Sequence, residues 1–150
     1  MSIDYIVASL PVLAFDQPAP ISWERFLGIA SGAYRESAAW RDLETQLRNA
    51  MAEARGGAKW KRSATGCSQY WKNRVTACFA ERDVLRREAA LDRVWWDAAG
   101  ELTPPASPLG AGALETYGIR LKIALKRSAV SREAGAAAFD RLTAATKLEF

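Results

Sequence analysis

The stretch LETYGIRLKIAL at positions 114–125 decides the predicted fold. Its larger apolar side chains recur every three or four residues, at Leu114, Tyr117, Leu121 and Leu125. This spacing places them on one face of an α-helix. Ile119 and Ile123 widen that face, so the helix is apolar over a broad arc that other helices must cover. Lys126 and Arg127 form the predicted last turn, where cations suit the helix dipole.

Three segments before this one have the same helical periodicity. One follows a predicted N-cap at Ser22. A second carries apolar residues from Trp40 to Met51 and ends at Gly56-Gly57. The third runs from about residue 68 to 97 as one helix. The residues expected on its inner face are Trp71, Val75, Cys78, Leu85 and Ala89.

Ser131 is a predicted N-cap for a closing helix. Its inward residues are expected to be Phe139, Leu142, Ala145 and Leu148. At the other end of the chain, the apolar run Tyr5–Leu10 is too short to distinguish a strand from the start of a buried helix. We therefore expect an all-α bundle of about five helices behind a short apolar N-terminal segment, with residues 1–150 forming a single domain.

The composition argues against an enzyme. The chain has 150 residues and no histidine, which excludes Ser-His-Asp and Cys-His arrangements and metal sites built on imidazole. Carboxylate pairs such as Glu88 with Asp92 alternate with arginines, as on a solvated helix face that carries salt bridges. Cys67 and Cys78 are expected to be small buried residues in a reducing compartment. We expect no catalytic residue, no cofactor and no metal.

The sequence also bears on location. The N-terminus lacks the basic region of a signal peptide, and no apolar stretch approaches the length of a transmembrane helix. The chain is therefore expected to be cytoplasmic, with attachment to the inner membrane only as a peripheral part of a protein complex. The net charge of +4 favours anionic partners only slightly.

One basic segment is distinctive, because no acidic residue lies between Glu53 and Glu81. The candidate interaction residues in it are Arg55, Lys59, Trp60, Lys61, Arg62, Lys72 and Arg74. Cations beside aromatic rings are typical of single-stranded nucleic-acid binding. The alternative interpretation is a solvated loop followed by a core helix, with Tyr70 and Trp71 facing inward.

Two parts of the sequence resemble a known family. The opening DYIVASLP at 4–11, with FD at 15–16 and PAPIS at 18–22, is similar to the start of a bacterial family of unknown function. Genes for that family typically lie among those for V-type (A/V-type) ATPase subunits. The stretch LETYGIRLKI at 114–123, with EAG at 133–135, resembles the closing helix pair of the same family and of the C/d-type subunit of these ATPases.

The resemblance implies a non-catalytic helical subunit or accessory of a rotary ATPase, between the central stalk and the membrane ring. Its partners would be the ATPase subunits, and any contact with a membrane would be indirect. The competing hypothesis is a small basic nucleic-acid-binding protein that uses the segment Arg55–Arg74.

Overall fold

The computed structural model describes residues 2–148, with the side chains of 132–139 and 145–148 left undescribed. Its α-helices are α1 (Ile3–Ser9), α2 (Trp23–Ala30), α3 (Ala38–Ala54), α4 (Gln69–Cys78), α5 (Val84–Ala99) and α6 (Ala111–Leu148). Two short 3₁₀ helices, η1 (Ala58–Trp60) and η2 (Gly100–Leu102), follow α3 and α5. No strand occurs between residues 2 and 148, so the all-α prediction is confirmed, and residues 3–9 are helix.

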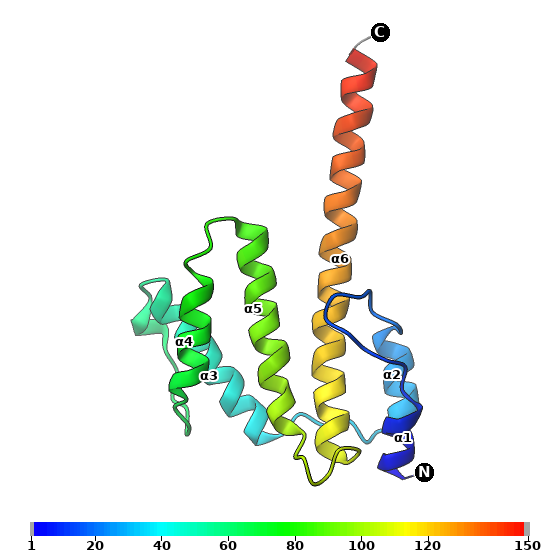
Figure 1. The fold of residues 1–150 in the computed structure, drawn as a ribbon, viewed down its shortest axis with the longest axis vertical. Coiled ribbons are helices and arrows are strands. Elements are labelled where there is room, and N and C mark those ends of the chain that lie inside the picture. Colours follow the sequence, from blue (N-terminus) through cyan, green and yellow to red (C-terminus); the bar gives the residue numbers. More distant parts are fainter. Residues whose placement is uncertain (1, 149–150) are drawn as a thin grey trace.

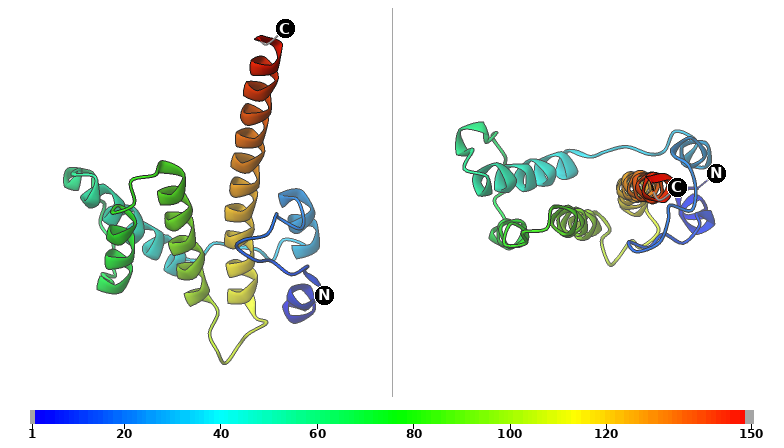
Figure 2. Two further views of the ribbon diagram at one scale, coloured as in Figure 1. Left: turned by 45° about the horizontal axis from the view of Figure 1, so that its top comes forward. Right: turned by 90° about the horizontal axis from the view of Figure 1, so that it is seen from above.

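Helix α6 stands between two groups of helices (Figure 1), with α3, α4 and α5 on one side and α1 and α2 on the other. Seen from above, this order is plain (Figure 2). Ile119 and Ile123 belong to the hydrophobic cluster of the first group, whereas Leu114 and Leu121 belong to that of the second. The broad apolar arc predicted for this helix exists because α6 is covered on two faces.

Side-chain caps explain where most of the helices begin. Ser22, predicted as an N-cap, accepts a hydrogen bond from the backbone N–H of Arg25 at 3.1 Å. Ser2, Ser37 and Ser68 cap α1, α3 and α4 in the same way. A cap of this kind satisfies one of the backbone donors that the first turn leaves unpaired.

The prediction of one helix from about residue 68 to 97 is wrong. Residues 79–83 form a turn, and Asp83 starts α5 by accepting a hydrogen bond from the N–H of Arg86 at 3.0 Å. The turn lets α5 fold back beside α4 (Figure 1). Leu85, expected to face inward, is 65% exposed because the helical register of α4 does not continue into α5.

A second correction concerns the helix predicted around residues 114–127 and the closing helix predicted after Ser131. The two form the single helix α6 of 38 residues. Ser131 lies inside it and caps nothing, because no glycine or proline interrupts residues 126–134. Leu142, expected to face inward, is exposed, and the side chains of Phe139, Ala145 and Leu148 lie outside the described residues. Within the described chain, no helix is both long enough and apolar enough to span a membrane.

The segment between α2 and α3 is fixed to α6 by a very close contact. A Cβ atom added at Gly118 would overlap Cε2 of Tyr34, so the Tyr34 ring packs directly against the helix backbone. Glu36 accepts hydrogen bonds from the Tyr34 hydroxyl at 3.2 Å and from Lys122 Nζ at 2.9 Å. These bonds, the one from Lys122 above all, hold the pKa of Glu36 below its usual value.

Candidate functional site

A row of polar side chains on α3 binds the backbone of the strap, the extended residues 61–68. Asp42 accepts hydrogen bonds from the backbone N–H of Thr65 at 2.5 Å and of Gly66 at 2.9 Å. Gln46, one turn further on, accepts from the N–H of Ser68 at 2.8 Å. These backbone donors stabilise the carboxylate and lower the pKa of Asp42 below its usual value.

The same row continues along α3 and fixes the basic end of the strap. Asn49 makes two hydrogen bonds to the backbone of Arg62, accepting from its N–H at 2.8 Å and donating to its carbonyl at 2.7 Å. Glu53 pairs with Lys61 and with Lys72, each at 3.2 Å. Hydrogen bonds from Lys61 and then Lys72 lower the pKa of Glu53.

The structure therefore separates the basic residues singled out in the sequence. Lys61 and Lys72 meet at Glu53, while Arg74 pairs with Asp97 at 3.0 Å on α5. Arg55 lies over the ring of Phe79, with its guanidinium carbon 5.5 Å from the centroid. The segment does not form one continuous cationic face.

Trp60 and Arg62 do lie together, in a groove of about 410 Å³ on the outer side of α3, here called the Trp60 groove. The residues that line it are Arg41, Glu44, Thr45, Arg48, Asn49, Trp60 and Arg62. Trp60 is placed there by η1 and is 73% exposed. Lys59 Nζ lies 5.4 Å from the centre of the Trp60 ring.

Three arginines and one carboxylate give the Trp60 groove its charge. Arg48 pairs with Glu44 at 3.5 Å, and Arg41 Nη2 donates to the carbonyl of Glu36 at 3.0 Å. In the sequence, Arg41 and Arg48 belong only to the outer face of an amphipathic helix, so they were missed as site residues. Their spacing along α3 gives no sign that the loop after it returns to place Trp60 beside them.

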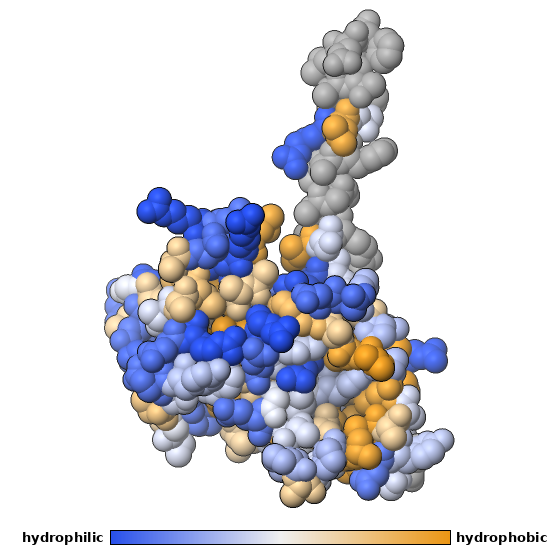
Figure 3. Space-filling view, viewed as in Figure 1, coloured by the Kyte–Doolittle hydropathy of each residue, from blue (hydrophilic) through white to orange (hydrophobic). Residues whose placement is uncertain are grey.

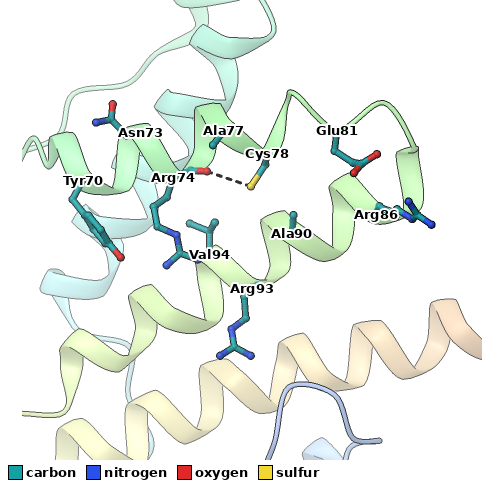
Figure 4. Close-up of a pocket in the computed structure, with 10 residues that line it drawn as sticks. All are labelled: Tyr70, Asn73, Arg74, Ala77, Cys78, Glu81, Arg86, Ala90, Arg93 and Val94. Carbon is teal, nitrogen blue, oxygen red and sulfur yellow. Dashed lines mark hydrogen bonds between the residues drawn. The ribbon is translucent and has the colours of Figure 1, made fainter.

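A second and larger groove, of about 580 Å³, lies between α4 and α5 (Figure 4). Its apolar wall includes Cys78 and Val94, and its polar side chains include Arg74 and Arg93. Both arginines pair with Asp97, Arg93 at 3.2 Å. Cys78 Sγ donates to the carbonyl of Arg74 at 3.3 Å, and burial raises the pKa of this thiol.

The structure tests two predictions about residues 67–78. Cys78 is buried as predicted, but Cys67 is exposed because it lies in the strap and not in a helix. Trp71 faces the core and donates through Nε1 to Glu101 at 2.8 Å. Its neighbour Tyr70 is exposed, whereas the interpretation as a solvated loop followed by a core helix expected both Tyr70 and Trp71 to face inward.

A third groove, of about 330 Å³, lies between the first half of α5 and the middle of α6 and is called the α5–α6 groove. Leu85 and Val130, 65% and 45% exposed, line it from the two helices. Asp92, which also lines the groove, pairs with Lys126 at 2.7 Å and with Arg127 at 3.8 Å. Apolar surface is visible at this place in Figure 3.

Within the described residues, no three histidine, cysteine, aspartate or glutamate side chains are grouped to hold a metal ion. The chain was compared with protein-family models, with curated proteins and with solved structures, and nothing matches it.

Proposed function

We propose that this chain is a non-catalytic structural subunit of a bacterial V-type ATPase that links or assembles the central stalk and the membrane ring. The observation that carries the structural part of the proposal is the projecting half of α6. The choice of complex rests on the resemblance of residues 4–22 and 114–123 to the ATPase-associated family.

The two halves of α6 have different surroundings. The first half is held between both hydrophobic clusters, as far as Leu125. The second half extends beyond the rest of the fold (Figures 1 and 2), and its described side chains at 129–131, 140–142 and 144 are exposed. The 38 residues of α6 span about 57 Å at about 1.5 Å per residue.

A projecting helix of this kind gains stability from a partner. Most helix stability in proteins comes from packing of an apolar face and not from intrinsic propensity. The α5–α6 groove, with Leu85 and Val130 exposed at the base of the projection, offers apolar area next to the uncovered helix. A partner helix laid along α6 would cover both, as expected for a subunit in a stalk.

The proposal is tested by affinity purification of the tagged full chain from its own cells after gentle solubilisation of the membranes. We expect the catalytic, stalk and ring subunits of the ATPase to co-purify in a fixed ratio. Leu85→Glu combined with Val130→Glu should abolish that recovery, because two like charges placed across the groove prevent its burial by a partner.

The matched control is Val12→Glu, since Val12 is 91% exposed, lies in the loop after α1 and does not line the α5–α6 groove. This variant should recover the same subunits as the unmodified chain. Recovery of an intact ATPase without this chain would refute the assignment to the complex. Equal recovery by the double variant and the control would refute the groove as the contact.

A further inference from the structure

We infer that the Trp60 groove binds a nucleobase joined to phosphate, either in a short single strand or as a free nucleotide. The inference is independent of the proposed ATPase role and rests on the groove itself. One exposed indole ring and three guanidinium groups line the same cavity of about 410 Å³. An exposed aromatic ring and guanidinium groups are the two components that recognise a base and its phosphate.

The indole ring provides the stacking platform. Trp60 is 73% exposed, whereas Trp40, Trp71 and Trp96 are buried in the hydrophobic core. A large ring at the surface beside cations is free to stack on a base, and every base offers a π-face for this contact. Lys59 Nζ lies over one face of the ring, 5.4 Å from its centre, so the opposite face is the one on which a base would stack.

The guanidinium groups provide the anion site. Arg41, Arg48 and Arg62 line the groove with Glu44 as the one carboxylate among its lining residues. Glu44 pairs with Arg48 at 3.5 Å, and Arg41 donates to the carbonyl of Glu36 at 3.0 Å. With three guanidinium groups and one carboxylate, the lining has a net positive charge. Arginine is well suited to phosphate because its planar fork donates two parallel hydrogen bonds.

The loop that carries this chemistry is held in place before any ligand arrives. Asn49 fixes the backbone of Arg62 through two hydrogen bonds, and η1 orients Trp60 two residues earlier. Little ordering of the backbone is therefore left for the binding step, which favours affinity. An acidic peptide would use the three arginines but would leave the exposed indole ring without a stacking partner.

The experiment is fluorescence anisotropy at low salt with a labelled 15-nucleotide oligothymidylate, followed by competition with ATP, ADP, inorganic phosphate and polyglutamate. We expect binding that weakens with salt at a slope of about −2 in log affinity against log salt, because each of three phosphate contacts contributes about −0.7. Competition by ATP or ADP at concentrations where phosphate has no effect would identify a free nucleotide as a ligand. Binding of the strand without such competition would identify single-stranded nucleic acid.

Variants distinguish this groove from general attraction to a basic protein. Trp60→Ala should weaken binding about tenfold or more through the loss of stacking. Arg62→Ala should reduce the salt slope by about 0.7. The matched control is Arg25→Ala, which removes an exposed arginine of α2 outside the groove and should leave both quantities unchanged.

All of these residues are exposed, so the variants should keep the circular dichroism and melting temperature of the unmodified chain. Polyglutamate competing as well as the strand, with no effect of Trp60→Ala, would overturn the inference. The absence of binding to every probe at low salt would overturn it too, as would an equal loss with Arg25→Ala.

Discussion

Asn49 holds the backbone of Arg62 as a neighbouring β-strand would, accepting from its N–H at 2.8 Å and donating to its carbonyl at 2.7 Å. No strand lies beside the strap in the part of the chain that the structure describes, so a helix side chain satisfies backbone groups that sheet pairing would otherwise satisfy. Asp42 and Gln46 do the same for Gly66 and Ser68. The polar face of α3 is therefore structural along much of its length.

Replacing Asn49→Ala removes both bonds to Arg62. Each hydrogen bond contributes a net of about 0.5–1.5 kcal/mol, so the free energy of unfolding should fall by about 1–3 kcal/mol. Urea denaturation followed by circular dichroism measures this change. Arg48→Ala, on the same helix, removes an exposed ion pair with Glu44 and not a hydrogen bond to the strap, so it should change the free energy by less than about 0.5 kcal/mol. Equal effects of the two variants would contradict the role of Asn49.

The strap should also loosen in acid. Hydrogen bonds from Thr65 and Gly66 lower the pKa of Asp42 in the folded state, so its ionised form is the one that folding favours. This stabilisation is present above the unfolded pKa of about 3.9 and disappears as the pH falls through the lower folded pKa. Glu53, whose pKa is also lowered, acts in the same direction.

Amide chemical shifts of Thr65 and Gly66, followed by NMR as the pH falls, measure the titration of Asp42 directly. We expect a midpoint below the usual value for aspartate. In Asp42→Asn the same amides should show no such titration, and the stability of the variant should depend less on pH in this range. A midpoint at or above the usual value would contradict the assignment.

Apolar periodicity and capping residues predicted the helices correctly where the tertiary packing follows the same pattern. The apolar period from Leu114 to Leu125 and the cap at Ser22 both correspond to real features of the helices. The turn at 79–83 was missed because it contains no glycine or proline, and its one local signal is Asp83. The opposite error occurred at Ser131, where a helix start was predicted and none exists. A residue suited to capping can also lie within a helix.

The Gly118–Tyr34 contact predicts opposite effects for two Gly→Ala substitutions. Gly118→Ala would make Cβ overlap Tyr34 Cε2, so the ring must move, and overpacking of this kind costs about 1–3 kcal/mol. Gly28, inside α2, has no atom within 4 Å of an added Cβ, and Gly28→Ala should stabilise by about 0.5–1 kcal/mol. Thermal melts of the two variants should shift in opposite directions. A higher melting temperature for Gly118→Ala would refute the close contact.

The candidate site was predictable only in part. Trp60 and Arg62 stand out in the sequence because they lie in a cationic, aromatic loop. Arg41 and Arg48 did not, because their place in the groove depends on the return of that loop to α3. Conversely, the sequence suggests that Lys61 and Lys72 are unpaired cations, but Glu53 pairs with both. These pairs depend on the path of the chain after α3, which no local sequence pattern specifies.

The continuity of α6 can be tested with one proline. If Ser131 capped a separate helix, residue 132 would be its first helical position, where proline is well tolerated. In the continuous helix, Arg132→Pro instead removes an internal hydrogen bond and clashes with the preceding turn, at a cost of about 3 kcal/mol or more. Helical circular dichroism should therefore fall in Arg132→Pro and stay unchanged in the control Arg132→Ala.

The melting temperature should separate this local effect from global unfolding. Among the described side chains of α6, Leu125 is the last that belongs to a hydrophobic cluster, so Arg132→Pro should melt close to the unmodified chain despite its lower helix content. Equal helix content in the proline and alanine variants would show that α6 is interrupted near Ser131. If the proline variant also fails to recover ATPase subunits while Arg132→Ala succeeds, the projecting half of α6 is the part that the complex requires.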